Sequence, residues 1–166
     1  MRRPACSCDS AVVSGELIIV SGLPGSGKTT QARRLEAERP GLRLSADDWM
    51  EALGASVWEG ALRERIERLQ RRVCGDILRI GGTVIIEWGT WARAERSQLV
   101  EDARRANARV ELVVLDPPLE VLWERICARG AEDPPITWTD LTRWSTMFER
   151  PDEAESARYD AFTRIG

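Results

Sequence analysis

A glycine-rich segment near the start of the chain constrains the fold more than any other feature. Residues 22–29 read Gly-Leu-Pro-Gly-Ser-Gly-Lys-Thr and match the pattern G-x-x-x-x-G-K-[ST] in full. The apolar run at residues 17–20 precedes this segment, and a helix is predicted from Lys28 to about Glu38, before Pro40-Gly41. Glycines let backbone N–H groups converge on phosphate oxygens at the positive end of the following helix. The pattern therefore predicts a strand, a phosphate-binding loop and a helix.

The residue types in this loop indicate how a nucleoside triphosphate would bind. Lys28 is predicted to bridge the β- and γ-phosphates of ATP, and the Thr29 hydroxyl is predicted to bind Mg²⁺. Lys28 is also the sole lysine among 24 basic residues. Lysine is a compact point charge whereas arginine is a wide planar fork, so a crowded phosphate loop suits lysine alone. The residues that we expect to contact the nucleotide are Gly22, Leu23, Pro24, Gly25, Ser26, Gly27, Lys28, Thr29 and Thr30.

Strand-like and helix-like patterns alternate along the rest of the 166 residues. The alternation predicts an α/β phosphate-loop NTPase fold, a three-layer α/β/α sandwich around a parallel sheet of four to five strands. Residues 1–15 are predicted to be a flexible leader, and residues 16–166 one domain with a lid around 125–140. We expect strands at residues 17–20, 42–44, 83–87 and 110–115, with a short edge strand near 159–165, and helices at residues 62–80, 94–108 and 119–129.

Other phosphate-loop classes fit the sequence less well than a small kinase does. A GTPase needs an N-K-x-D motif to read guanine, and the one lysine already lies in the phosphate loop. A motor or transporter ATPase has a long apolar strand that ends in Asp and is followed by a catalytic Glu, which residues 84–87 match only in part. What remains is a kinase with an acceptor pocket and an arginine-bearing lid.

Carboxylates follow two of the predicted strands. Asp47 and Asp48 follow the second strand, and ligand chemistry gathers at the carboxyl ends of strands in open α/β sheets. Asp47 is the predicted general base for an attacking hydroxyl. Asp48 is also the third residue of a capping box opened by Ser45, so its role stays open between cap and substrate contact. Glu87, at the end of the third strand, is expected to hold Mg²⁺ through water or to touch the acceptor.

Arginines near the predicted lid are candidates for binding the transferring phosphoryl group. Arg125 and Arg129 lie on one face of the helix before the polar break at residues 130–135, where a lid kinase places such groups. Arg93 and Arg96, after the third strand, are further candidates for acceptor contacts. In a chain with 23 arginines, each of these could equally be a solvated side chain.

Seven tryptophans are many for a chain of this length. Trp123 and Trp144 fit helical stripes that face a core. Trp49, Trp88 and Trp91 come just after the carboxyl ends of the second and third strands, where flat side chains could line a pocket for a ring-containing acceptor. Ordinary burial is the alternative for these three.

Net charge, apolar runs and cysteine content indicate which classes of binding partner and which compartment suit the chain. The net charge of −3 disfavours a broad basic face of the kind that duplex-binding proteins carry. No apolar run approaches the ~18 residues of a membrane span, so we expect a cytoplasmic protein. Four scattered cysteines, Cys6, Cys8, Cys74 and Cys127, are predicted to be free thiols.

Several segments together resemble a known family. The loop GLPGSGKTT, the sequence Ser-Ala-Asp-Asp-Trp at 45–49, and Glu87 followed by Trp-Ala-Arg-Ala-Glu-Arg at 91–96 resemble bacterial AAA-type phosphate-loop kinases. That family is related to chloramphenicol phosphotransferase, zeta toxins and the kinase domain of phage polynucleotide kinase. The similarity extends from about Leu17 to Asp160. It implies a fold like that of nucleoside and shikimate kinases, with ATP and Mg²⁺ as cofactors.

The resemblance also bears on the acceptor. In polynucleotide kinases the segment after the second strand reads Arg-Asp-Asp-x-x-Arg, and its first Asp is the general base, a role that maps onto Asp47. Ala46 and Met50 stand where the two arginines would be, and this loss of contacts to a 3′-phosphate disfavours an oligonucleotide acceptor.

We therefore expect phosphoryl transfer from ATP to a hydroxyl of a small molecule, such as a natural product, an antibiotic or a nucleoside. The alternatives are a 5′-hydroxyl polynucleotide kinase, a nucleotide-sugar kinase like the zeta toxins, and a non-catalytic ATP-binding regulatory module. The sequence leaves the acceptor and the oligomeric state open.

Overall fold

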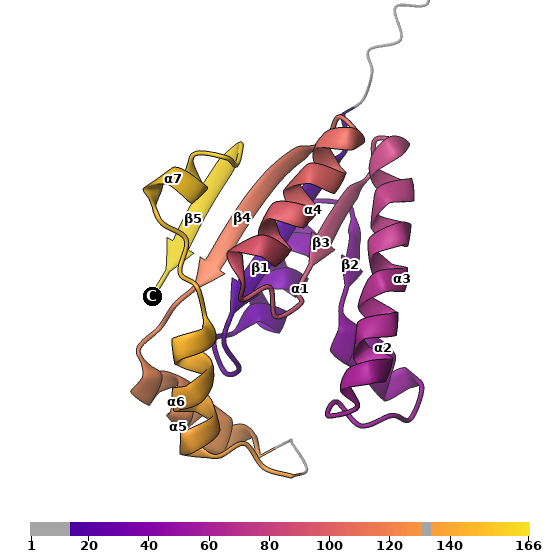
Figure 1. Ribbon diagram of the computed structural model, residues 1–166. Coiled ribbons are helices and arrows are strands. Elements are labelled where there is room, and N and C mark those ends of the chain that lie inside the picture. The colour runs from indigo at the N-terminus through magenta and orange to yellow at the C-terminus, as the bar shows by residue number, and fades with distance from the viewer. Residues whose placement is uncertain (1–13, 131–133) are drawn as a thin grey trace, which may run out of the picture.

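The computed structural model describes residues 14–130 and 134–166, and its centre is a five-stranded parallel sheet with the strand order β2-β3-β1-β4-β5 (Figure 1). This confirms the predicted α/β class and the parallel sheet. In chain order the elements are β1 (Glu16–Gly22), α1 (Lys28–Glu38), β2 (Leu42–Leu44), α2 (Ala46–Ala52), α3 (Gly60–Arg79), β3 (Thr83–Ile86), α4 (Arg93–Arg105), β4 (Arg109–Leu115), α5 (Leu119–Arg129), α6 (Trp138–Met147), α7 (Glu153–Ser156) and β5 (Ala161–Ile165).

Successive side chains of β1 point to opposite faces of the sheet, and each face has its own part of the hydrophobic core. Ile18 and Val20 are fully buried and pack with Ala32 and Leu35 of α1. Leu17 and Ile19 point the other way, into the larger cluster that also contains the buried residues of α3 and α4. Because a strand buried on both faces must be apolar at every position, the unbroken run at 17–20 is what a central parallel strand requires.

The predicted boundaries agree with the structure to within a few residues. The helix predicted at 119–129 has those bounds, and Ser45 and Thr137 cap α2 and α6 by accepting hydrogen bonds from the third residue of each helix. One element was not predicted: the four-residue helix α7 had no clear periodic signal.

The helix pair α5 and α6 lies beyond the carboxyl ends of the strands (Figure 1). This pair spans the lid predicted around 125–140, of which residues 131–133 lie outside the described residues. The predicted leader at 1–15, with Cys6 and Cys8, is described only at residues 14 and 15. Across the part of the chain that the structure describes, none of the helices combines the length and apolar character that crossing a membrane requires.

Candidate active site

The glycine-rich loop leaves backbone donors available at the start of α1. Gly25 and Gly27 have φ values of 78° and 95°, which residues with side chains rarely adopt. Gly27 is the N-cap of α1, so no side chain caps the first N–H groups of that helix. Uncapped N–H groups and the helix dipole favour an anion at this place.

The ammonium group of Lys28 turns back onto its own loop. Its Nζ donates a hydrogen bond to the carbonyl oxygen of Leu23 at 2.9 Å. Burial lowers the pKa of Lys28 from its ordinary value to about 8, against the opposing effect of the Asp47 and Glu87 carboxylates. A phosphate beside this ammonium would restore the charged form, because nearby negative charge raises the pKa of a lysine.

Two further groups complete the loop. The hydroxyl of Ser26 is buried and has no hydrogen-bond partner among the described residues. Arg125 of α5 reaches the loop from the lid side, where its guanidinium lies 3.4 Å from the carbonyl oxygens of Gly25 and Ser26. An orphaned hydroxyl and a cation beside uncapped amides fit a bound polyphosphate.

The loop opens onto a cavity of about 1090 Å³. This volume exceeds what a triphosphate alone would fill, so room remains for a second substrate. The predicted site residues that line the cavity are Pro24, Gly25, Gly27, Lys28, Thr29, Thr30, Asp47, Glu87, Trp88, Trp91 and Arg129. Gly22, Leu23, Ser26, Asp48, Trp49, Arg93 and Arg125 are not among the described residues that line it.

The two neighbouring aspartates at the start of α2 differ in their surroundings. Asp47 is exposed, lines the cavity and pairs with Arg63 of α3. Asp48 pairs with Arg43 of β2, while its backbone N–H donates to the Ser45 hydroxyl. Asp48 is therefore engaged as a cap and an ion-pair partner, and Asp47 is the aspartate that faces the cavity.

Glu87 is a buried carboxylate at the end of β3. Its Oε1 accepts a hydrogen bond from Arg43 at 2.7 Å, and its Oε2 is buried with no hydrogen-bond partner in residues 14–130 and 134–166. Burial raises the pKa of Glu87, although Ser45 and Arg43 oppose this effect. An orphaned carboxylate oxygen close to a phosphate loop fits a site where an ion or a polar substrate group binds.

The structure describes no cluster of three or more Asp, Glu, Cys or His side chains that could hold a metal ion by itself. An Mg²⁺ ion bound to phosphates usually keeps several waters and needs only one or two protein oxygens. Thr29, in the first turn of α1, and the free Oε2 of Glu87 are the oxygens that suit such an ion.

The tryptophans near the cavity hold their N–H groups in internal hydrogen bonds. Trp88 Nε1 donates to Gln70 at 2.6 Å, and Trp91 Nε1 donates to the carbonyl oxygen of Gly22 at 3.2 Å. Trp144, which sequence periodicity assigned to a core stripe, packs against the core and also lines the cavity. Trp58 lines it from the segment between α2 and α3, and no sequence pattern singled it out.

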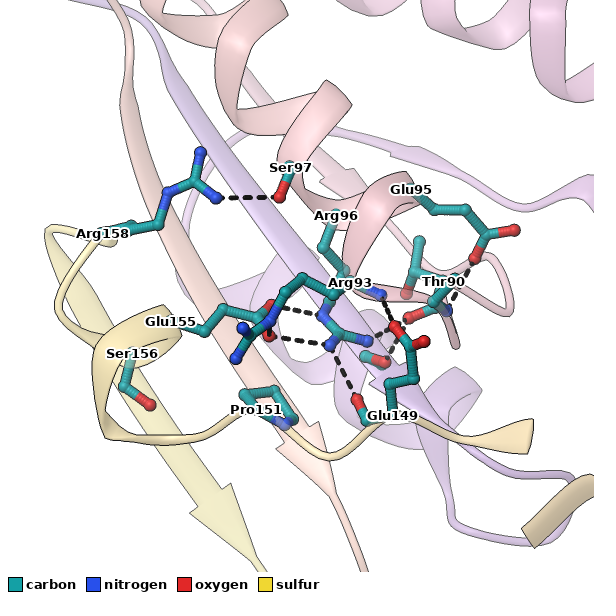
Figure 2. Close-up of polar contacts among 12 residues, drawn as sticks. Thr90, Arg93, Glu95, Arg96, Ser97, Glu149, Pro151, Glu155, Ser156 and Arg158 are labelled. Atoms are coloured by element: carbon teal, nitrogen blue, oxygen red, sulfur yellow. Dashed lines mark hydrogen bonds and ion pairs between the residues drawn. The ribbon is translucent and has the colours of Figure 1, made fainter. Parts of the chain in front are cut away.

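The loop between β3 and α4 is held from behind by an arginine. Arg96 is fully buried and pairs with Glu155 through two hydrogen bonds of 2.7 and 3.0 Å (Figure 2). Its guanidinium also donates to the carbonyl oxygens of Thr90 and Trp91 at 2.9 and 3.0 Å. Arg93, predicted as an acceptor contact, instead reaches Glu155 at 2.9 Å (Figure 2). It is not among the described residues that line the cavity.

Comparison with known proteins places this geometry in a family. The family described as "AAA domain" matches residues 17–151, which include the phosphate loop, Asp47, Glu87 and both lid arginines. The chain belongs to this AAA domain family of P-loop kinases. The match covers every strand of the sheet except β5 in full or nearly so.

The chain is also similar to individual proteins, and the solved structures among them share its fold. The chain is 30% identical over 138 residues to a guanylate kinase from Symbiobacterium thermophilum, and it spans about 65% of the length of that protein. Among solved structures, shikimate kinase from Acinetobacter baumannii in complex with shikimate has a TM-score of 0.58 at 18% identity, covering 94% of this chain and 87% of that one. The Pnkp1/Rnl/Hen1 RNA repair complex gives a TM-score of 0.70 at 22% identity, covering 92% of this chain and 48% of that one.

Sequence reasoning missed two arginines in this AAA domain chain. Arg43 pairs with both Asp48 and Glu87. Arg63 pairs with Asp47, and the Nε of Arg63 also lies 3.1 Å from a carboxylate oxygen of Glu67. Neither residue belongs to a motif. The one available signal was that Arg43 interrupts the otherwise apolar strand β2, where a charged side chain needs a partner.

Proposed function

We propose that this chain is an ATP- and Mg²⁺-dependent kinase that transfers the γ-phosphoryl group to a hydroxyl group of a small molecule. The observation that carries the proposal is the shared cavity. The uncapped start of α1, Lys28 and the carboxylate of Asp47 all face one space that is larger than a triphosphate needs.

In this proposal the donor half of the cavity is built by the phosphate loop. The N–H groups of Gly25 and of residues 27–29 and the Lys28 ammonium bind the β- and γ-phosphates, and the Ser26 hydroxyl gains the partner that it lacks. Thr29 would hold Mg²⁺, and Glu87 would bind a water of that ion through its free Oε2. When bound, the ion neutralises charge on the phosphate oxygens.

The reaction would need one base and several cations. The acceptor hydroxyl oxygen forms a bond to the γ-phosphorus as the bond from that phosphorus to the β,γ-bridging oxygen breaks, and ADP leaves with the electron pair. The hydroxyl proton passes to Asp47 Oδ2, because Oδ1 already accepts a hydrogen bond from Arg63. Arg125, beside the loop carbonyls, and Arg129, in the cavity wall, stabilise the charge that moves onto the phosphoryl oxygens.

Acceptor-dependent release of ADP tests the proposal. A panel of amino sugars, nucleosides, antibiotics, guanylate and a 5′-hydroxyl oligonucleotide is offered with ATP and Mg²⁺. The Asp47→Asn variant should lose about 10²- to 10⁴-fold of the turnover found with the best acceptor, since it cannot take the proton. Asp76→Asn is the matched control and should keep full turnover. It alters an exposed carboxylate near the C-terminal end of α3, beyond the residues of that helix that line the cavity.

Lys28→Met checks the donor half in the same assay and should strongly weaken ATP binding, so that little acceptor-dependent ADP is released. Full turnover by Asp47→Asn on a true acceptor would show that the base is a different group. If ATP binds but no compound in the panel raises ADP release above the basal rate, the non-catalytic ATP-binding module becomes the better account. Faster turnover of guanylate or of the oligonucleotide than of any uncharged alcohol would move the acceptor assignment to that class.

A further inference from the structure

One wall of the cavity beyond the phosphate loop is aromatic. Trp58, Trp88, Trp91 and Trp144 line it, and the ring centroids of Trp144 lie 6.3 Å from those of Trp58 and 5.9 Å from those of Trp91. The indole N–H groups of Trp88 and Trp91 already donate to internal partners. Trp88 is buried to all but 7% of its surface, so the half-buried Trp91 and the partly exposed Trp58 and Trp144 offer most of the ring surface of this wall. Indole faces attract flat bodies and cations.

The other wall is acidic. Lys28, Arg129 and Glu87 belong to the donor half; without them, the cavity lining holds two more carboxylates than guanidinium groups. The carboxylates are Asp47, Glu51, Glu64, Glu67 and Glu95, and the guanidinium groups are those of Arg63, Arg68 and Arg71.

Each of the three arginines is engaged within the protein. Arg63 pairs with Asp47 and Glu67, and Arg68 lies 3.5 Å from Glu64. Arg71 pairs with Asp102, which does not line the cavity. An anionic acceptor would have to displace these intramolecular pairs in a field that repels it, so the lining disfavours phosphorylated acceptors.

Two carboxylates of the lining lack a matching cation in the part of the chain that the structure describes. The carboxylate of Glu51 forms no ion pair with any residue in 14–130 or 134–166. Among the same residues, Glu95 accepts a hydrogen bond from the N–H of Ala92 and forms no ion pair. Burial raises the pKa of Glu67 against the opposing effect of Arg63, and the nearby charges of Glu95 and Asp47 add to the rise. A cation in the cavity would relieve this repulsion.

We propose that the acceptor is an alcohol that also carries a protonated amine on a flat or apolar body. The body stacks on the tryptophan wall, and the ammonium group lies among Glu51, Glu67 and Glu95. This inference rests on the proposed kinase function, which it deepens. A protonated amine has no free electron pair, so the hydroxyl oxygen remains the nucleophile: it bonds to the γ-phosphorus, its proton goes to Asp47, and ADP departs.

A matched pair of compounds tests the charge requirement. L-Tryptophanol and N-acetyl-L-tryptophanol share the ring and the primary hydroxyl, but only the first is a cation at pH 7. Isothermal titration calorimetry is run on the full chain with a non-hydrolysable ATP analogue and Mg²⁺. We expect the dissociation constant of the acetylated compound to be at least about tenfold higher, the size of a cation–π contact combined with a partly exposed ion pair.

Variants connect that ratio to the acidic wall. The double variant Glu67→Gln/Glu95→Gln should bring the two dissociation constants to within about threefold of each other. The matched control Glu101→Gln alters an exposed carboxylate of α4 that is outside the cavity and should keep the tenfold ratio. Equal affinity in the unmodified protein, tighter binding of the acetylated compound, an unchanged ratio in the double variant, or no measurable binding of either compound would each overturn the proposal.

ADP release separates this inference from the proposed function. If the amine binds preferentially but no acceptor stimulates ADP release, the cation site stands and the kinase function fails. If uncharged acceptors are turned over with the same kcat/KM as their amine counterparts, the kinase function stands and the cation site fails.

Discussion

Replacing the buried Arg96 with methionine should strongly destabilise the protein. The substitution leaves Glu155, itself 2% exposed, with Arg93 and Tyr159 as remaining partners, and it removes the arginine donor from the carbonyl oxygen of Glu149. The carbonyl oxygens of Thr90 and Trp91 also lose this donor, although each keeps another, the Ser21 hydroxyl and the Glu149 N–H respectively. Removing one partner of a buried ion pair costs roughly 3–5 kcal/mol because the other charge stays behind in a poorly solvated place. We expect a loss of about 4 kcal/mol, a large share of the roughly 5–15 kcal/mol that stabilises a typical domain.

Urea unfolding followed by tryptophan fluorescence measures the change in the free energy of unfolding. The double variant Arg96→Met/Glu155→Leu removes the stranded charge and should regain about 2 kcal/mol, since well-packed apolar pairs often replace buried ion pairs at little cost. Arg105→Met is the matched control, because Arg105 is 68% exposed and its ion pairs with Glu101 and Asp102 are worth at most about 1 kcal/mol. A loss below 1 kcal/mol for Arg96→Met, or a double variant no more stable than the single one, would refute this reasoning.

Three further predictions concern single side chains of the site. Lys28 has a pKa of about 8 before the phosphates bind, so its protonated form predominates below that pH. The dissociation constant of ATP should therefore rise up to tenfold for each pH unit above 8. Titrations of ATP binding from about pH 7 to 9.5 measure this, and Lys28→Met should bind ATP weakly with no such pH dependence. Gly27→Ala should lower the free energy of unfolding in urea by about 1–2 kcal/mol, because the φ of 95° strains any residue with a Cβ. No other atom lies within 4 Å of where that Cβ would be, so backbone strain is the only expected cost. An unchanged free energy of unfolding would mean that the loop relaxes. Gln70→Leu leaves the buried N–H of Trp88 and the buried carbonyl oxygen of Ser45 without a hydrogen-bond partner. It should lower the free energy of unfolding by roughly 2–5 kcal/mol. A melting temperature equal to that of the unmodified protein would contradict the role of Gln70 as a bridge between these two groups.

The parts of the site that sequence could predict are those encoded over short distances. The phosphate loop is a contiguous motif, so Lys28 and Thr29 are recognisable without any tertiary information. Asp47, Glu87 and Trp88 follow from one further step, because the carboxyl ends of parallel strands meet at the same edge of the sheet.

What sequence could not predict depends on pairing between distant segments. Arg96 and Glu155 are 59 residues apart, and in a chain with 23 arginines nothing local selects that pair. For the same reason Arg93 could be placed after β3 but not assigned its partners. Trp144 shows the limit of periodicity, because a helical stripe identifies the inward face of α6 without saying whether that face meets the core or a cavity.

The division of the core by the sheet has a consequence for how the molecule can diverge. The helix α1 begins at the phosphate loop and packs on one face of the sheet, against Ile18 and Val20. The helices α3 and α4 supply much of the acidic wall and pack on the other face, in the cluster of Leu17 and Ile19. Substitutions on α3 and α4 can therefore accumulate without changing what α1 rests on. Descendants of this chain could therefore change the acidic wall while the packing of α1 on the sheet stays the same.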